Sequence, residues 1–276
     1  MGRKMAQFLL QDGYPLLAYD AGEEQLRSIA ADGAKAAANN AEVVRECEII
    51  FTSLPLSEIW VDVVERDILP NCRPGQIFID MGTVTPPETR RVYKMFREKG
   101  AHLIDSPISD VGGEGHKLFL FIGGDKEIVD LCLPVFESLG VSEHTVYCGP
   151  SGSGQIVKGI NQMGMGLLDA AVVEIISFGV QCGIEPEVFA RAVGVENAPG
   201  FRGMLHKAVK NGNMEHTAVK HGQLKYYLKE AEEKGFELPL VKTLHEFLKD
   251  KPATIQDANR RSASYWNELI NRKEEQ

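Results

Sequence analysis

The first half of this sequence alternates short apolar runs with longer amphipathic stretches, and this alternation limits the possible folds more than any other feature. Parallel strands need crossover connections that usually contain a helix, so the pattern predicts a doubly wound parallel sheet over residues 1–150. The expected strands are Pro15–Asp20, Glu48–Leu54, Gln76–Met81, His102–Asp105, Lys117–Ile122 and Thr145–Cys148. The expected helices are Gly22–Ala31, Ser57–Arg66, Pro87–Lys99 and Lys126–Leu139.

The second half changes character near Gly149, beyond which apolar residues recur with helical spacing and no strand pattern returns. We therefore predict an all-helical domain over residues 151–276. Its helices are expected at Gly154–Cys182, Glu185–Val193, Thr217–Lys234 and Pro239–Lys249. The first of them is rich in Met, Ala, Val and Ile around its circumference, which predicts burial by other helices and by a second subunit.

Composition narrows the class of protein. The 276 residues are 43% hydrophobic with a formal net charge of -9, so we expect a soluble protein that binds neither nucleic acid nor an anionic membrane surface. No apolar run is expected to span a membrane, and no signal-peptide pattern is visible. The 5 cysteines are scattered without a C-x-x-C pair, and the histidines share no metal spacing. This predicts a cytoplasmic protein without a metal site.

The segment from Gly149 to Gln162 reads GPSGSGQIVKGINQ, and it contains the strongest catalytic candidates. Lys158 follows a glycine-rich helix start, and Asn161 and Gln162 come three and four residues later on the same helical face. A lysine amine flanked by carboxamides suits proton transfer at a hydroxyl or carbonyl oxygen. The alternative is a solvated helix with an ordinary surface lysine.

The start of the chain differs from that of a usual nucleotide-binding domain. A helical pattern opens it, where such a domain has a strand and a glycine-rich turn. Gly2 alone could be the third glycine of a G-x-G-x-x-G fingerprint. Asp20 ends the next expected strand, where an acidic residue accepts from a ribose hydroxyl, although an aspartate there is also a common turn former.

Several of these segments occur in the order found in the β-hydroxyacid dehydrogenases, which include 3-hydroxyisobutyrate and tartronate semialdehyde dehydrogenases. The chain resembles that family over nearly its whole length. The matching segments are Met1–Ala6, Ser53–Pro55, Asp80–Pro86, Asp105–Ser109, Ile122–Asp125 and Gly152–Gln162.

The resemblance implies an oxidoreductase that transfers a hydride between a nicotinamide cofactor and a small 3-hydroxy carboxylate. It implies that Lys158 is the general acid and base, that Asn161 and Gln162 hold the substrate oxygens, and that Ser109 donates to the substrate carboxylate. It also implies a homodimer or homotetramer, in which residues 151–276 form the domain for substrate binding and dimerisation.

For the cofactor, the resemblance assigns binding to Gly2, Asp20, Leu54, Pro55 and Thr83. An aspartate that accepts from a free ribose 2′-hydroxyl favours NAD, and Ala21 follows it where an arginine would serve the 2′-phosphate of NADP. We therefore expect NAD, with NADP as the alternative.

Three departures from the family pattern support a second hypothesis, a catalytically impaired scaffold or binding relative. The first strand and its glycine turn are missing, which predicts weak dinucleotide binding unless Met1 is an internal methionine. Asp110 brings a negative charge beside Ser109, in a segment where Gly112 and Gly113 are part of a shortened loop. A Lys-Asp pair of the second domain is not evident, because Gly222 and Gln223 occupy its place. Lys225 could substitute, but a solvated lysine is the simpler reading.

Overall fold

A computed structural model describes residues 1–110, 118–210, 218–220, 222–248 and 260–262. Thr217, Lys249, Gly112 and Gly113, which appear in the expectations above, lie outside these ranges. The chain divides into two compact units, Met1–Lys158 and Gly159–Gln276.

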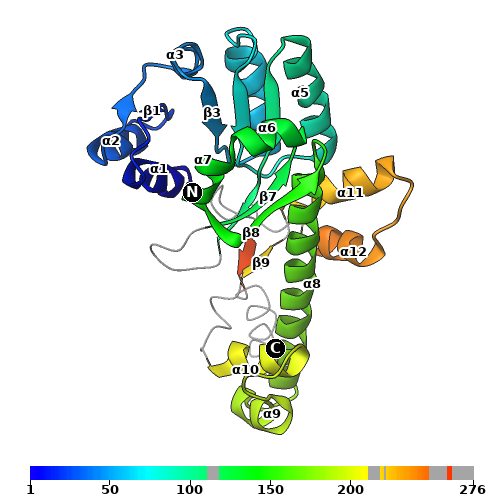
Figure 1. Ribbon diagram of the computed structural model, residues 1–276. Helices are drawn as coiled ribbons and strands as arrows, with labels where there is room; N and C mark the ends of the chain where they lie inside the picture. Colours follow the sequence, from blue (N-terminus) through cyan, green and yellow to red (C-terminus); the bar gives the residue numbers. More distant parts are fainter. Residues whose placement is uncertain (111–117, 211–217, 221, 249–259, 263–276) are drawn as a thin grey trace. The chain divides into compact units, whose positions relative to one another are not determined.

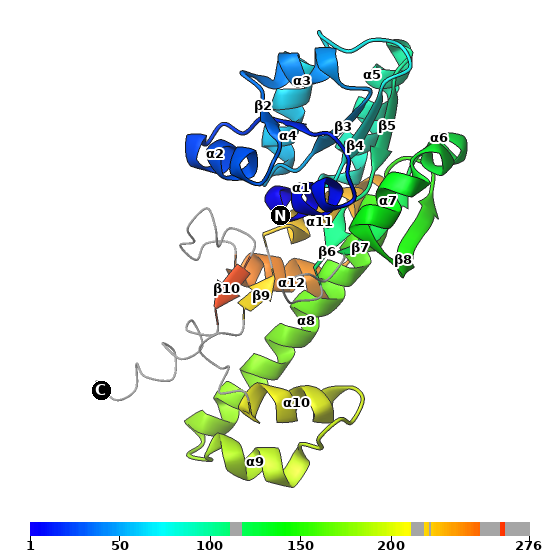
Figure 2. The ribbon, with the colours of Figure 1, turned by 60° about the vertical axis from the view of Figure 1, so that its left-hand side comes forward.

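The first unit is an α/β structure built on two groups of strands (Figures 1 and 2). A mixed sheet of six strands has the order β3-β4-β5-β7-β6, with β8 paired to β7, and β1 and β2 form a separate parallel pair. The strands are β1 (Leu17–Ala18), β2 (Lys35–Ala36), β3 (Ile49–Thr52), β4 (Ile77–Asp80), β5 (His102–Asp105), β6 (Ile108–Ser109), β7 (Leu118–Gly123) and β8 (Gly140–Gly149). The doubly wound parallel arrangement predicted for β3, β4 and β5 is confirmed.

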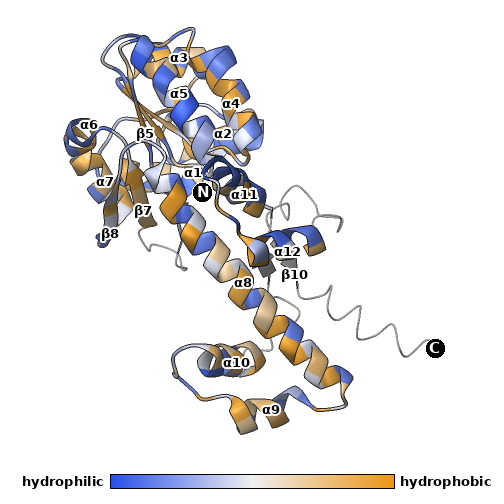
Figure 3. Cartoon of the chain, turned by 90° about the vertical axis from the view of Figure 1, so that its right-hand side faces the viewer, coloured by the Kyte–Doolittle hydropathy of each residue, from blue (hydrophilic) through white to orange (hydrophobic). Residues whose placement is uncertain are grey.

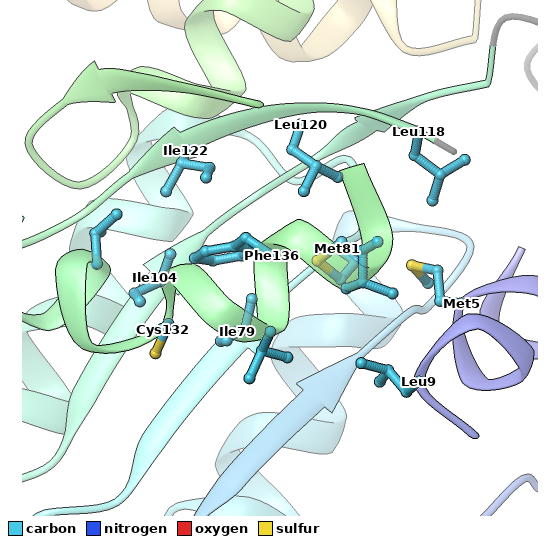
Figure 4. Packing of buried hydrophobic residues seen from close by; sticks show 13 residues of the cluster. Met5, Leu9, Ile79, Met81, Ile104, Leu118, Leu120, Ile122, Cys132 and Phe136 are labelled. Atoms are coloured by element: carbon cyan, nitrogen blue, oxygen red, sulfur yellow. The ribbon is translucent and has the colours of Figure 1, made fainter. Parts of the chain in front are cut away.

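Helices connect these strands and cover both faces of the larger sheet. They are α1 (Gly2–Gln11), α2 (Glu23–Ala31), α3 (Asn40–Glu46), α4 (Ser57–Val63), the π-helix η1 (Val64–Ile68), α5 (Pro86–Glu98), α6 (Lys126–Leu131) and α7 (Leu133–Leu139). Neighbouring residues of one strand enter different cores, because successive side chains point to opposite faces. Ile79 and Ile104 pack with α1, α6 and α7, as Figure 4 shows for Phe136 and Leu9. On the other face, Phe78 and Leu103 pack with α3, α4 and α5.

The pair β1-β2 is separate from the larger sheet, and the break lies where a nucleotide-binding domain has its first strand. In the usual doubly wound order that strand lies between the strand after the first helix and the strand after the third. Here these are β1 and β3, and the described residues provide no strand between them. Leu9 and Met5 of α1 nevertheless pack into the core beside Ile79 and Met81, so α1 occupies the position expected of the first helix of such a domain.

One predicted helix and one predicted strand of the first unit need correction. The single helix expected over Lys126–Leu139 is broken at Cys132 into α6 and α7, because Pro134 in the first turn of α7 lacks the N–H that a continuous helix needs. The strand expected at Thr145–Cys148 begins earlier, at Gly140, and pairs with β7 through two register irregularities. Short elements such as β2, β6 and α3 were not predicted, because they span only a few residues with little periodicity.

The second unit is mostly helical, and the helices form two small cores. One helix, α8 (Ser153–Gln181), begins in the first unit and continues through the second; the other helices are α9 (Pro186–Val193), α10 (Phe201–Lys210), α11 (Leu224–Glu233) and α12 (Pro239–Leu248). The expectation that no strand follows Ser151 is wrong, because β9 (Ala218–Lys220) pairs antiparallel with β10 (Arg260–Ser262). The helix expected from Thr217 accordingly begins at Leu224.

Helix α8 is also longer and more apolar than expected. Its 29 residues include an 18-residue window with mean hydropathy 1.7, so by length and composition alone it could cross a membrane, and the expectation that no run reaches this length does not hold. Figure 3 shows apolar residues along its whole length. The same helix contains Lys158, Asp169 and Glu174. An apolar core helix of a soluble protein has the same composition, so this feature alone is weak evidence for membrane insertion.

Two glycines of α8 have different surroundings. A Cβ on Gly159 would overlap the ring of Tyr227 in α11, whereas a Cβ on Gly164 would meet nothing within 4 Å. Tyr227 is buried and packs where Gly159 leaves room. One turn further along, the Gln162 amide donates to the Gln223 side chain at 2.8 Å. The absence of a side chain at Gly159 therefore permits the close approach of α8 to α11.

We expect Gly159→Ala to destabilise the protein by about 1–3 kcal/mol, the usual cost of forcing an extra methyl group into a packed contact. The matched control is Gly164→Ala in the same helix, which should be neutral or stabilising by up to about 1 kcal/mol through helix propensity. Urea denaturation followed by circular dichroism measures both. Equal midpoints for the two variants would contradict the proposed close contact.

Candidate functional site

Three of the segments singled out by the sequence leave the sheet at one edge. Thr52, Asp80 and Asp105 are the last residues of β3, β4 and β5, and they are paired side by side across the parallel strands. Ser53–Pro55, Met81–Thr85 and Ser106–Ser109 therefore begin at the same carboxyl edge. In open α/β sheets this edge is where ligands bind.

Four of the five residues expected to bind cofactor, Gly2, Leu54, Pro55 and Thr83, lie at or near this edge. Gly2 begins α1 beside Ser53, since a Cβ on Gly2 would lie 3.6 Å from the Ser53 Cβ. Leu54 is half-buried and Pro55 exposed, and the Leu54 carbonyl oxygen lies against Gly82. Thr83, which follows Gly82, is half-buried.

Asp20 lies after β1 and is exposed. One carboxylate oxygen accepts a hydrogen bond of 2.8 Å from the Gly22 backbone N–H, so Asp20 forms the turn that leads into α2. This geometry agrees with the turn-forming alternative. The turn uses only one carboxylate oxygen, so the other oxygen of this exposed side chain can still accept from a ribose hydroxyl. The turn-forming and ribose-binding interpretations of Asp20 are therefore compatible.

Lys158 is buried rather than solvated. Its side chain projects from the second turn of α8, only 5% of the residue surface is exposed, and Nζ donates to the Ile108 carbonyl oxygen at 2.6 Å. Ile108 immediately precedes Ser109 on β6. The structure thus brings the amine of Lys158 to the strand that holds Ser109, which rules out the surface-lysine alternative.

The start of α8 is held by a buried carboxylate. Asp105 is fully buried, and its two oxygens accept from the backbone N–H groups of Gly152 at 2.7 Å and of Gln155 at 3.2 Å. A carboxylate at a helix N-terminus satisfies free N–H groups and interacts favourably with the helix dipole. A Cβ on Gly154 would overlap the Phe121 carbonyl oxygen. The glycines of this motif thus admit the strand backbone against the helix start.

A second buried carboxylate, Asp80, joins the ends of β3 and β4. One oxygen accepts from the Thr52 hydroxyl at 2.8 Å and from the Gly82 backbone at 3.2 Å. The Thr52 hydroxyl in turn accepts from the indole of Trp60 at 3.0 Å. The side-chain amide of Gln155 approaches the other Asp80 oxygen at 3.5 Å.

Both carboxyl groups are less acidic than usual. Burial raises the pKa of Asp80 to about 7, against the opposing effect of the hydrogen bond from Thr52. Burial likewise raises the pKa of Asp105 to about 6, opposed by the backbone hydrogen bonds from Gly152 and Gln155. Desolvation is the dominant cause in both cases, because it disfavours the charged form.

Asp110 forms an ion pair that the sequence did not suggest. Its carboxylate lies 3.0 Å from the ammonium of Lys4 in α1, and both side chains are partly exposed. The negative charge beside Ser109 is therefore balanced by a cation from the start of the chain, which reduces the repulsion expected for an anionic substrate.

Asn161 and Gln162 carry buried polar atoms that lack partners among the described residues. These atoms are Asn161 Nδ2 and Gln162 Oε1, and Tyr227 Oη is in the same state. Gln162 uses its other atom to donate to Gln223. Most buried polar groups in folded proteins are hydrogen-bonded, so atoms without partners need an explanation such as a bound ligand or water. This donor and acceptor set suits oxygen atoms of a ligand.

The sequence missed several residues of the site. Gln155 lay unassigned inside the glycine–lysine motif, and Asp80 and Asp105 were noted only as motif positions. Their signal was an acidic residue at the end of an apolar strand. Lys4 and Tyr227 gave no signal, because their partners are distant in sequence.

Comparisons with known proteins agree on one family. Residues 1–149 match the family of the NAD-binding domain of 6-phosphogluconate dehydrogenase. The 2-(hydroxymethyl)glutarate dehydrogenase of Eubacterium barkeri is 31% identical over 219 residues, covering 77% of this chain and 72% of that protein. The NAD-dependent L-serine dehydrogenase of Pseudomonas aeruginosa is 29% identical, covering 69% of this chain and 64% of that protein.

A solved structure shows the same fold. The 3-hydroxyisobutyrate dehydrogenase of Mycobacterium tuberculosis, determined with L-serine, aligns with a TM-score of 0.76 at 21% identity. The alignment covers 98% of this chain and 95% of that chain.

The buried Asp80 gives a testable dependence of stability on pH. The folded-state pKa of Asp80, about 7, exceeds the usual value of 3.8. The contribution of this group to the free energy of unfolding is therefore fully present below about pH 4 and is lost as the pH rises through 7. Asparagine does not titrate, so Asp80→Asn should remove this pH-dependent loss of the free energy of unfolding, which amounts to on the order of 4 kcal/mol over the full titration.

Thermal unfolding of parent and variant at pH 5 and pH 8 measures the effect. The change between the two pH values carries the test, because the substitution also alters the contact with Gln155. Asp12→Asn, at an exposed position, is the control. Parallel pH profiles for parent and Asp80→Asn would contradict the effect of burial on Asp80.

Proposed function

This chain belongs to the β-hydroxyacid dehydrogenase family of NAD(P)-dependent oxidoreductases, and we propose that it transfers a hydride between a nicotinamide cofactor and a small 3-hydroxy carboxylate, with Lys158 as general acid and base. The observation that carries this proposal is the buried Lys158 amine, 2.6 Å from the Ile108 carbonyl oxygen. Proton transfer needs such a positioned group close to the reacting oxygen.

The residues at the sheet edge fit a dinucleotide. Gly2 and the free N–H groups at the start of α1 would face its phosphates, since a helix N-terminus favours anions. Asp20 would accept from the ribose 2′-hydroxyl, and Leu54, Pro55 and Thr83 would flank the nicotinamide. The exposed carboxylate of Asp20 favours NAD over NADP, because it would repel a 2′-phosphate.

The bound nicotinamide would supply the acceptor for the hydride that leaves the carbinol carbon. During oxidation the neutral amine of Lys158 would take the proton of the substrate hydroxyl, and during reduction the ammonium would return it to the carbonyl oxygen. Ser109 would donate to the substrate carboxylate, while Lys4 balances the charge of Asp110 nearby. Asn161 and Gln162, on the same helix, would hold the substrate oxygens with their unpartnered atoms.

We also propose that the chain forms a homo-oligomer through α8. Apolar side chains recur along one side of this helix at successive spacings of eight, seven and three residues, and they are exposed: Ile160 (63%), Leu168 (55%), Ile175 (51%) and Phe178 (69%). At 3.6 residues per turn these four positions form one stripe. A second copy presents the same stripe, and a symmetric pairing would bury both.

A cytoplasmic location is part of the proposal. Five free cysteines, of which one is buried, three are half-buried and Cys182 is exposed, are typical of proteins in a reducing compartment.

Lys158→Met should lower kcat by about 10²–10⁴-fold, the usual effect of losing a general acid or base. The substitution keeps the volume and the apolar stem of the side chain, so the fold should persist. The assay follows NADH at 340 nm with 3-hydroxyisobutyrate, L-serine and 2-(hydroxymethyl)glutarate as substrates. Lys225→Met is the matched control and should retain the parent rate.

Two results would count against this reading. Equal turnover in the Lys158 and Lys225 variants would remove Lys158 from the chemistry. A folded parent with no turnover on any 3-hydroxy acid would favour the impaired scaffold or binding relative.

Phe178→Glu should convert the oligomer to smaller species, because it places a charge within the apolar stripe of α8. Sedimentation velocity measures the change. Leu131→Glu, at an equally exposed apolar side chain of the first unit (70%), should leave the parent distribution intact. A monomeric parent, or equal behaviour of both variants, would contradict oligomerisation through this stripe.

A further inference from the structure

Gln155 connects two parts of the site that are distant in sequence. Its side chain is fully buried in the first turn of α8. The amide nitrogen donates to the Gly82 carbonyl oxygen at 3.0 Å, and the amide oxygen accepts from the Val84 N–H at 3.1 Å. One side chain thus binds the backbone on both sides of Thr83.

The backbone of Gln155 is also held in place, by a hydrogen bond to Asp105. The Gln155 N–H donates to the Asp105 carboxylate at 3.2 Å, beside the bond from Gly152. The first turn of α8, which contains Gln155, therefore cannot move relative to the end of β5 without breaking the hydrogen bonds to Asp105. Since Lys158 follows three residues later on the same helical face, its position is tied to the same anchor.

These bonds bring three functional candidates into one network. Thr83 lies between the two loop residues held by Gln155, Lys158 lies one turn along the helix, and Ser109 follows the residue whose carbonyl accepts from Lys158. We propose that Gln155 is a positioning residue that sets the distance between the Thr83 loop and the Lys158 amine. This role rests on the proposed dehydrogenase function.

A positioning role makes a prediction that general destabilisation does not. Hydride and proton transfer require both reacting partners at fixed separation, and a misplacement of about 1 Å can cost ~10²-fold in rate. Cofactor affinity depends less on this separation. Loss of Gln155 should therefore lower kcat far more than it weakens NADH binding.

The chain offers a matched control in Gln76, the residue immediately before β4. Its side chain is also buried and also binds backbone on two sides, donating to the carbonyl oxygens of Val44 at 2.6 Å and Cys47 at 2.7 Å. It further accepts from the Arg73 N–H at 2.8 Å. Gln76 and Asp80 lie at opposite ends of β4. Replacing Gln76 therefore removes hydrogen bonds to the backbone like those of Gln155, but at a position away from the site.

The experiment compares Gln155→Met with Gln76→Met in the full chain. For Gln155→Met we expect kcat to fall by about 10²-fold, with the KM and Kd for NADH within about threefold of the parent. We also expect a larger primary deuterium isotope effect, because hydride transfer becomes more rate-limiting. Gln76→Met should lose stability to a similar extent while keeping the parent isotope effect and nearly the parent kcat.

Hydrogen exchange gives a readout that does not depend on activity. The Val84 amide, which donates to Gln155, should exchange about tenfold faster in Gln155→Met and remain at the parent rate in Gln76→Met. Unchanged exchange at Val84 would overturn the inference. So would faster exchange with a parent-like kcat and isotope effect, or equal kinetic losses in the two variants.

The two proposals can fail separately. A parent without turnover on any 3-hydroxy acid would overturn the dehydrogenase function and the kinetic role of Gln155 with it. Accelerated exchange at Val84 in that case would still support Gln155 as the link that holds the Thr83 loop to α8.

Discussion

The hydrogen bonds from the start of α8 to the Asp105 carboxylate determine the geometry of the whole site. They attach a helix of 29 residues to the end of a central strand, through a carboxyl group that is completely buried. The desolvation that this requires is visible in the raised pKa of Asp105. An ionised carboxyl group in such a place is tolerated only because helix N–H groups supply the partners that water would otherwise provide. The position of Lys158 follows from this attachment.

The sequence was informative where physical requirements act locally. Strands such as β4 and β5 are buried on both faces, so their apolar runs stand out and were located within one or two residues. The start of α8 was likewise evident, because Gly152 has a positive φ of 89° and Gly154 is packed too closely to accept a side chain. The order of the motifs then indicated the family, which the comparisons establish.

The sequence was uninformative where partners are distant along the chain. The pairing of Lys4 with Asp110 joins residues 106 positions apart, and the hydrogen bond from the Val84 N–H to the Gln155 side chain joins residues 71 apart. No periodicity connects such positions, so neither contact could be predicted. The strands β9 and β10 were missed for a related reason, because each spans three residues and is stabilised by pairing rather than by an apolar pattern.

The close packing at Gly154 has a consequence for how this protein can change. The Phe121 carbonyl oxygen and the Asp105 backbone occupy the volume that any side chain at that position would need. Substitutions at the start of α8 are therefore excluded on the face that packs against the sheet. Small changes at that face cannot reposition the Lys158 amine. New substrate preferences in descendants of this chain would have to arise at positions other than Gly154 and Gly159, both of which are packed too closely to accept a side chain.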